Sequence, residues 1–391
     1  MRSLEASIRA TVERAPASCG LRNEWSSDPY LQARRAMEIC NACRYCEGFC
    51  AVFPAMTRRR SFEDRDLDFL ANLCHGCRSC YYSCQYAPPH EFGVNVPRVF
   101  AEVRMRSYER YSWPAPLGRL FRRNGFVVSA IMGLGVALAM FLASIFIEGA
   151  ALSRPVLAPG DFYSIVPHAV MVWLAGGAFL FALLALIIGA VGFWRDIGGK
   201  RPISRAALME AIRDALTLRN LGGPGTRGCN DRNERYSNLR RRFHHALAYG
   251  FLLCFGATSV ATVYEYVFKW VAPFGFFSLP VQLGFWGGIG MVLGAGGLFV
   301  LKASGEADVA APAASASDRS MLAVLSLIAL TGLLLLALRA TSWAGLLLVL
   351  HLGLVVAFFL VIPYSKMVHG VYRFIALLHD AVERQPLKPL R

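Results

Sequence analysis

Eight cysteines in the first quarter of the chain follow one spacing twice. Cysteines separated by two, two and three residues occur in CNACRYCEGFC and again in CHGCRSCYYSC. Soft thiolate ligands suit iron, and this order of gaps is typical of a site that holds two [4Fe–4S] clusters. In such a site three close cysteines bind one cluster and the fourth binds the other, so the two motifs form a single site.

The spacing assigns four ligands to each cluster. The first set is Cys40, Cys43, Cys46 and Cys84, and the second set is Cys74, Cys77, Cys80 and Cys50. The alternative is a pair of zinc sites, but these prefer two C-x2-C pairs with a longer gap between them. Proline usually follows the fourth cysteine, whereas Ala51 and Gln85 stand there in this chain. We therefore expect a different turn geometry with the same number of ligands.

Histidines in or beside apolar segments indicate a second cofactor. His351 and His369 lie 18 residues apart, which on one helix is about five turns, so both would face the same way roughly 27 Å apart. Two stacked b-type haems have this arrangement, and each needs a second axial ligand. We expect His168 to pair with His351 on the outer side, and His244 or His245 to pair with His369 on the inner side. Alternatively, such histidines contact lipid headgroups or cap helices.

Six further residues are candidates for a role in cofactor binding or structure. His75, between two cluster ligands, is expected to be a solvated turn residue, although a hydrogen bond from it would tune a cluster. Cys229 and Cys254 are expected to be structural. The adjacent residues Tyr364, Ser365 and Lys366 are candidates for a quinone pocket near the inner haem, with Lys366 alternatively an interface anchor.

The composition is that of a membrane protein. Of the 391 residues 55% are hydrophobic, and the mean hydropathy is +0.41. Lys- and Arg-rich cytoplasmic loops account for the formal charge of +15, so nucleic-acid binding is not expected. Most of the eleven cysteines fall in the twin motif, which argues against a secreted disulfide framework and for a cluster site in a reducing compartment.

We expect a mainly α-helical protein in three parts. Residues 1–38 are a soluble extension, 39–115 a helical two-cluster ferredoxin domain, and 120–391 a transmembrane domain. Between the motifs, SFEDRDLDFLANLC indicates a helix with Ser61 as its N-cap. Residues 303–320 are expected to be a flexible linker. About six segments are long and apolar enough to span a bilayer, namely 126–147, 166–194, 245–270, 281–301, 321–338 and 343–363.

The distribution of positive charge predicts the orientation. The loop 195–243 is dense in Arg and Lys, whereas the loop 148–165 carries one Arg and the loop 271–280 none. Because positive loops remain inside, the dense loop is expected in the cytoplasm. With six spans, both termini and the ferredoxin domain then lie on the cytoplasmic side of a bacterial inner membrane. The N-terminal residues also lack the apolar core of a signal peptide.

The chain resembles the tricarballylate-utilisation or citrate-utilisation protein B family. The residues that carry the resemblance are RRFHHALAYGFLLCF, SLPVQLGFWGGIG and PYSKMVH. The membrane half is also similar to the haem b subunit of respiratory nitrate reductases, whose last haem helix has two histidines at the spacing of His351 and His369. The partner helix of that subunit supplies two histidines within its span, whereas here only the adjacent His244 and His245 are present, so the outer haem depends on His168.

The resemblance implies an electron carrier that serves a separate cytoplasmic FAD-dependent dehydrogenase, which oxidises tricarballylate to cis-aconitate. We therefore predict a membrane-bound protein that passes electrons from this flavin through two clusters and b-type haem to the quinone pool. The chain shows no nucleophile, general base or nucleotide motif for substrate chemistry of its own. One alternative is a membrane-anchored ferredoxin for metal or oxidase assembly, without haem. Another is a transporter or sensor with regulatory clusters, but its spans would need more polar residues than these contain.

Overall fold

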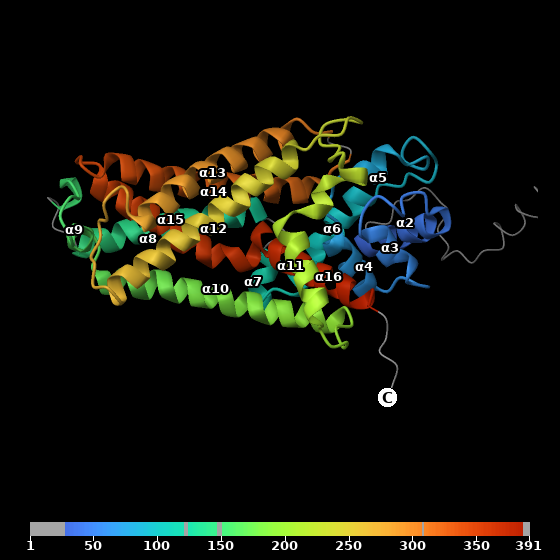
Figure 1. Cartoon of the computed structure of the whole chain (residues 1–391), viewed down its shortest axis with the longest axis horizontal. Helices are drawn as coiled ribbons and strands as arrows, with labels where there is room; N and C mark the ends of the chain where they lie inside the picture. Colours follow the sequence, from blue (N-terminus) through green and yellow to red (C-terminus); the bar gives the residue numbers. More distant parts are fainter. Residues whose placement is uncertain (1–27, 121–123, 147–150, 307–308, 386–391) are drawn as a thin grey trace, which may run out of the picture.

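The described part of the chain is built from α-helices, with no β-strand in it. The computed structural model describes residues 28–120, 124–146, 151–306 and 309–385, and the expected extension 1–38 lies largely outside them. Figure 1 shows long helices side by side along the longest axis, with the blue N-terminal helices at one end and α9 (Asp161–Ile165) at the other. The first helices are α2 (Pro29–Cys43), α3 (Val52–Thr57), α4 (Asp64–Leu73), α5 (Ser79–Tyr82), α6 (Val96–Arg110) and α7 (Ala115–Leu120).

Local capping explains where the helices around the cysteines begin. Asp28 caps α2 by accepting a hydrogen bond from the Tyr30 amide, with Pro29 at the first helical position. Helix α4 has a capping box made by Glu63 and Asp66. The expected N-cap, Ser61, is therefore wrong by two residues, because the reciprocal pair of acidic side chains satisfies the amides at the helix start.

The long helices form the membrane-spanning part. Five of them are long and apolar enough to cross a bilayer, α10 (His168–Asp196), α12 (Leu239–Tyr266), α13 (Leu279–Ala303), α14 (Pro312–Leu338) and α15 (Ala344–Val361) with the turn that follows it. Among the described residues five helices therefore meet this criterion, where six spans were expected. The expected first span overlaps α8 (Asn124–Phe146), a 23-residue helix that packs on α15 and includes the apolar stretch Ala130–Leu142.

Helices α12 and α13 pack unusually closely. A Cβ atom at Gly250 of α12 would lie 2.7 Å from the carbonyl oxygen of Gly287 on α13. A Cβ atom at Gly287 would lie 2.9 Å from the amide of Cys254 on α12. Small residues at such crossings let the two backbones meet, which is a common device of membrane helices. The contact holds α12, which carries His244 and His245, in position against α13.

Two expectations about the second half of the chain are wrong. Residues 312–320, expected in a flexible linker, form the first turns of α14, because Pro312 at its first turn and the alanines after it favour a helix. The last helix also does not run through to His369. Helix α15 ends at Val361, where Pro363 starts a short 3₁₀ turn and Ser365 is extended, and α16 (His369–Glu383) begins afresh. His351 and His369 therefore belong to different helices.

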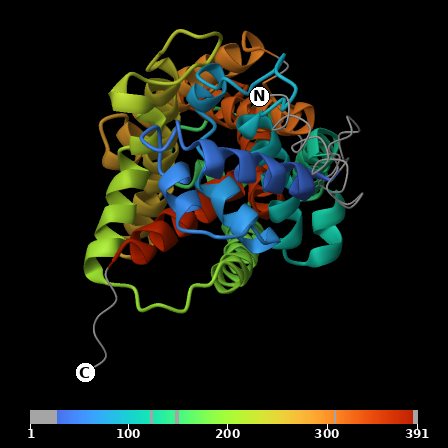
Figure 2. The same ribbon diagram turned by 90° about the vertical axis from the view of Figure 1, so that its right-hand side faces the viewer.

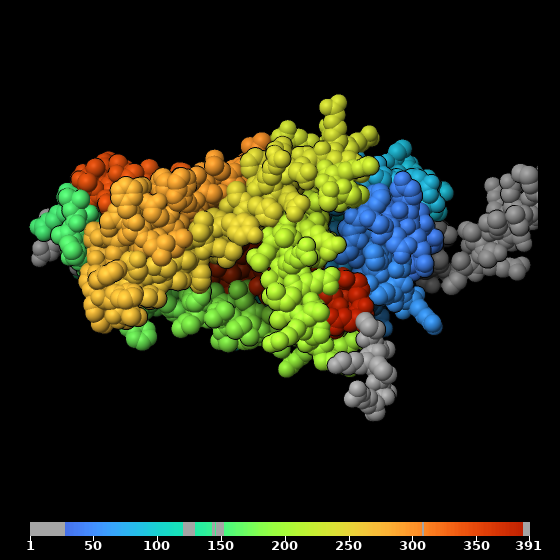
Figure 3. Space-filling model, viewed as in Figure 1, coloured from blue at the N-terminus to red at the C-terminus, as the bar shows by residue number. Residues whose placement is uncertain are grey.

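Helix α16 joins the cysteine domain to the membrane helices. It packs on α4 and on α11 (Arg205–Leu216) of the basic loop. Glu383 pairs with Arg59 at 2.9 Å, and Asp380 pairs with Arg58. Figure 2 views the molecule from this end, with the blue helices toward the viewer, and Figure 3 shows the yellow-green loop between α10 and α12 beside the blue domain. The cysteine domain and the basic loop therefore share one end of the bundle.

Candidate functional site

The eight motif cysteines lie in two adjacent groups. A cavity of about 250 Å³ beside the C-terminal part of α2 is lined by Cys40, Cys43, Cys46 and Cys84, and also by Cys80. A second, tighter cavity of about 20 Å³ is lined by Cys50, Cys74, Cys77 and Cys80. The ligation of iron by these residues stays a prediction, but each set of four assigned from the spacing lines a cavity of its own.

The thiols of each group influence one another electrostatically. Burial raises the pKa of the Cys40 thiol to about 12, and the thiols of Cys84, Cys46 and Cys43 add to the rise. Burial, followed by the neighbouring Cys77 and Cys74, likewise holds the pKa of Cys50 well above its ordinary value. Deprotonation of such buried thiols needs a compensating cation, which iron supplies, so the donor set fits iron. Among the described residues, no group of three or more His, Cys, Asp or Glu side chains is arranged to hold a single metal ion.

The basic loop supplies a ninth cysteine that the sequence did not reveal as functional. Cys229 is fully buried and packs against Cys77, although 152 positions separate them in the sequence. A hydrogen bond with Cys229 is the first cause that lowers the pKa of the Cys77 thiol, to about 6. The amide of Asn230 also donates to the carbonyl of Cys77 at 2.9 Å. Cys229 therefore touches the candidate cluster site, which no spacing rule could have indicated.

Cationic side chains surround the backbone of the second group. Arg240 of α12 donates to the carbonyl oxygen of Gly76 at 2.6 Å, and Arg373 of α16 donates to that of Cys74 at 3.0 Å. His75 is only 7% exposed, with its Nδ1 2.8 Å from the Leu73 carbonyl oxygen, so the expected solvated turn residue is wrong. The two arginines link the second cysteine group directly to helices that carry the candidate haem histidines.

The inner histidines lie close together. The ring centres of His244 on α12 and His369 at the start of α16 are 6.1 Å apart, with the ring planes at 76°. An iron atom that binds two imidazole nitrogens at about 2 Å each separates the ring centres by roughly 6 Å. Nδ1 of His369 bonds to the carbonyl oxygen of Lys366, which leaves Nε2 to face another partner. His245 instead lies beside Tyr249, with ring centres 5.7 Å apart.

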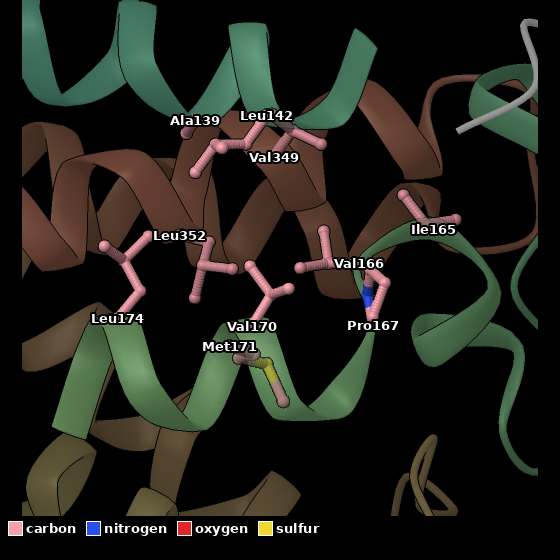
Figure 4. A pocket seen from close by; sticks show the side chains of 10 residues that line it. All are labelled: Ala139, Leu142, Ile165, Val166, Pro167, Val170, Met171, Leu174, Val349 and Leu352. Carbon is pink, nitrogen blue, oxygen red and sulfur yellow. The ribbon is translucent and has the colours of Figure 1, made fainter. Parts of the chain in front are cut away.

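The outer histidines have separate partners. His168 pairs with Glu265 of α12 at 3.3 Å, whereas His351 Nδ1 lies 3.0 Å from the Thr331 hydroxyl of α14. Near the outer end of α10, a cavity of about 20 Å³ lies between α8, α10 and α15 and has room for about one water molecule. Figure 4 shows its wholly apolar lining, to which neither histidine contributes. The contacts of His168 and His351 thus lead to different helices rather than to a shared site.

The comparisons with known proteins cover nearly the whole chain. Residues 122–389 match the family model described as citrate utilization protein B, and residues 33–110 match the citrate utilization protein B Fer4-like domain. The citrate utilization protein B of Escherichia coli is 46% identical over 361 residues, which are 92% of this chain and 94% of that protein. No solved structure matches the chain.

Proposed function

Since the chain belongs to the citrate utilization protein B family, we propose that it is a membrane-bound electron-transfer protein. In this role it reoxidises the reduced flavin of a partner dehydrogenase and delivers the electrons to the quinone pool. The ferredoxin-like domain and the five apolar helices give this role its two parts, a site for iron–sulfur clusters and an anchor in the membrane. By resemblance, the partner is the FAD-dependent tricarballylate dehydrogenase.

The observation that carries the proposal is the sorting of eight cysteines into two neighbouring groups. We assign one [4Fe–4S] cluster to Cys40, Cys43, Cys46 and Cys84, and the other to Cys74, Cys77, Cys80 and Cys50. Bound clusters supply one-electron carriers between a two-electron flavin and a one-electron acceptor. The first group lies in the wider cavity beside exposed Tyr45, so it is the one we expect to face the flavin.

The inner histidines are proposed to hold a single b-type haem. Their ring separation supports His244 and His369 as the axial pair, whereas the ring of His245 lies beside Tyr249. Arg373 lies four residues after His369 and donates to the carbonyl oxygen of Cys74, so α16 both carries His369 and contacts the second cysteine group. We do not carry the outer haem forward, because His168 and His351 have separate partners.

The proposed orientation places the cysteine domain in the cytoplasm of a bacterium, at its inner membrane. The basic loop 195–243 contacts that domain, since Arg78 donates to the carbonyl oxygen of Asp231 at 3.2 Å. Positive loops remain on the cytoplasmic side, so the cysteine domain, which contacts this loop, is placed on the same side. A flavoprotein in the cytoplasm then has direct access to the first cysteine group.

The cofactor content tests the proposal directly. Protein purified without oxygen is expected to hold about eight iron and eight sulfide ions per chain, with two interacting paramagnetic clusters after reduction. The measurements are iron and sulfide analysis together with electron paramagnetic resonance. Stoichiometric zinc in place of iron would overturn the assignment of the cysteines.

Cys229 is expected to tune the second cluster. The Cys229 thiol lies beside Cys77 and 3.3 Å from the Leu221 carbonyl oxygen, so replacing it by alanine removes a thiol donor that can serve the Cys77 sulfur. Hydrogen bonds to cluster sulfur stabilise the more negative, reduced state. We therefore expect the Cys229→Ala variant to lower one cluster potential by roughly 20–60 mV, since a hydrogen bond is worth about 0.5–1.5 kcal/mol and about 59 mV corresponds to a tenfold change. A redox titration monitored by paramagnetic resonance measures this shift. Cys229→Ser restores a donor and should reverse it, whereas an unchanged potential in Cys229→Ala contradicts the role.

A further inference from the structure

We propose that a cavity of about 340 Å³, where the cysteine domain meets the membrane helices, binds the headgroup of a quinone. This cavity lies between α6, the start of α14 and the break between α15 and α16. The inference rests on the proposed function and gives it a site, with named side chains that receive the two carbonyl oxygens of the quinone. Its defining residues are Tyr108, Ser317 and Lys366.

The position of the cavity suits an acceptor that comes from the membrane. Pro363 and Val368 line it from the break after α15, and Ala314 lines it from the first turns of α14. These apolar side chains offer a surface for a planar ring at the end of the bundle. Lys366 lines the cavity, and its carbonyl oxygen accepts a hydrogen bond from His369. A single residue therefore connects the cavity to the proposed haem ligand.

Two residues that line the cavity carry buried hydroxyls with no hydrogen-bond partner within the described parts of the chain. They are Oη of Tyr108 on α6 and Oγ of Ser317 on α14, where Ser317 is only 1% exposed. A buried hydroxyl without a partner is costly, and such groups usually mark a site that is completed by something else. A quinone has two carbonyl oxygens, which are acceptors, and each hydroxyl is a donor. The two unpaired hydroxyl donors therefore match the two carbonyl acceptors of a quinone in number and in type.

A lysine supplies the positive charge that quinone reduction needs. Lys366 lines the cavity and pairs with Asp318 Oδ1 at 3.0 Å, and Asp318 also pairs with Lys302. The Lys366 ammonium lies 5.9 Å from the Tyr108 ring centre, so both groups reach the same part of the cavity. Asp318 fixes Lys366 in place, and the ammonium stabilises the negative charge that develops on a carbonyl oxygen.

The reaction at this site balances with the flavin as the reductant. The partner's reduced flavin loses two electrons and two protons and becomes oxidised flavin. The quinone gains two electrons and takes up two protons from the adjacent aqueous side, so that both of its carbonyl groups become hydroxyl groups. In the product these hydroxyls can still bond to Tyr108 and Ser317, because hydroxyl oxygens both donate and accept.

The test uses Tyr108→Phe and Ser317→Ala, each of which removes one hydroxyl and little volume. The full-length protein is reduced with dithionite, and its reoxidation by a water-soluble short-chain ubiquinone is followed at several quinone concentrations. We expect each variant to raise the KM for this quinone about 3- to 10-fold, because one hydrogen bond is lost. The rate of reduction by dithionite and the thermal unfolding midpoint should match those of the parent protein. Ser315→Ala, on the same helix but outside the cavity lining, is the matched control.

The outcomes separate the site from the function. If both variants keep the parental KM while the parent protein is reoxidised by quinone, the quinone binds elsewhere and only this inference fails. If the parent itself is reduced but never reoxidised by quinone, the proposed acceptor is wrong and both proposals fail. A variant that unfolds is recognised by its thermal midpoint, and Tyr108→Leu or Ser317→Gly then replaces it in the same assay.

Discussion

Replacing Cys77 by alanine is expected to abolish the reoxidation of the partner's reduced flavin. Cys77 is 9% exposed and lines the second cavity with Cys50, Cys74 and Cys80. Removing one of four thiolates leaves an iron atom without its protein ligand, so the second cluster is lost or altered. Because this group contacts Arg240 and Arg373 of the helices that carry the proposed haem ligands, electrons then lose their proposed route toward the membrane. Flavin turnover should fall to the background rate.

Anaerobic mixing of the substrate-reduced dehydrogenase with membranes that contain the variant measures this effect. Binding of substrate to the dehydrogenase should stay unchanged, because it takes place on the other protein. Cys43→Ala, in the first group, should behave like Cys77→Ala. Cys254→Ala is the control, since Cys254 lies within α12 and packs against α13. Parental turnover in Cys77→Ala would mean that electrons bypass the second group.

Replacing His369 by alanine is expected to remove the haem absorbance of the purified protein. His369 faces His244 at a ring separation suited to two axial ligands, and the Lys366 carbonyl oxygen orients its ring. Loss of one of two axial ligands typically releases a b-type haem or leaves it with a changed spectrum. His244→Ala should have the same effect, whereas His245→Ala should keep the absorbance.

A reduced-minus-oxidised spectrum together with a pyridine haem assay measures the bound haem. The matched controls are His168→Ala and His351→Ala, whose partners are Glu265 and Thr331 rather than another histidine. We expect both to retain the haem of the parent protein. Loss of haem in His351→Ala with full retention in His369→Ala would reverse the assignment, and absence of haem in the parent would remove it.

The sequence predicted the parts of this protein that depend on local chemistry. The four cysteines that the spacing assigns to each proposed cluster line one cavity, because three of the four lie close together along the chain. Five of the six expected apolar segments coincide with helices long and apolar enough to cross a bilayer, since bilayer thickness sets the length of such segments. The placement of His351 and His369 on one helix was wrong and avoidable. Pro363 lies between them, and proline breaks a helix.

Contacts between distant segments were beyond sequence reasoning. Cys229 meets Cys77 only because the basic loop folds back over the cysteine domain. The partners of His168 and His351 depend on how α10, α14 and α15 are rotated, and continuous apolar surfaces leave such rotation undetermined. The prediction of a flexible linker over residues 303–320 was wrong at residues 312–320 because small residues such as Ala and Ser occur in both linkers and helices.

The central claim is that electrons enter this protein from a reduced flavin and leave it to a quinone. Stopped-flow absorbance of the substrate-reduced dehydrogenase, mixed with vesicles that contain this protein and quinone, tests the claim most directly. We predict flavin reoxidation in step with quinol formation, one quinol for each flavin, and none with vesicles that lack the protein. Reduction of the clusters without quinol formation, or flavin reoxidation that proceeds equally without the protein, would contradict the account.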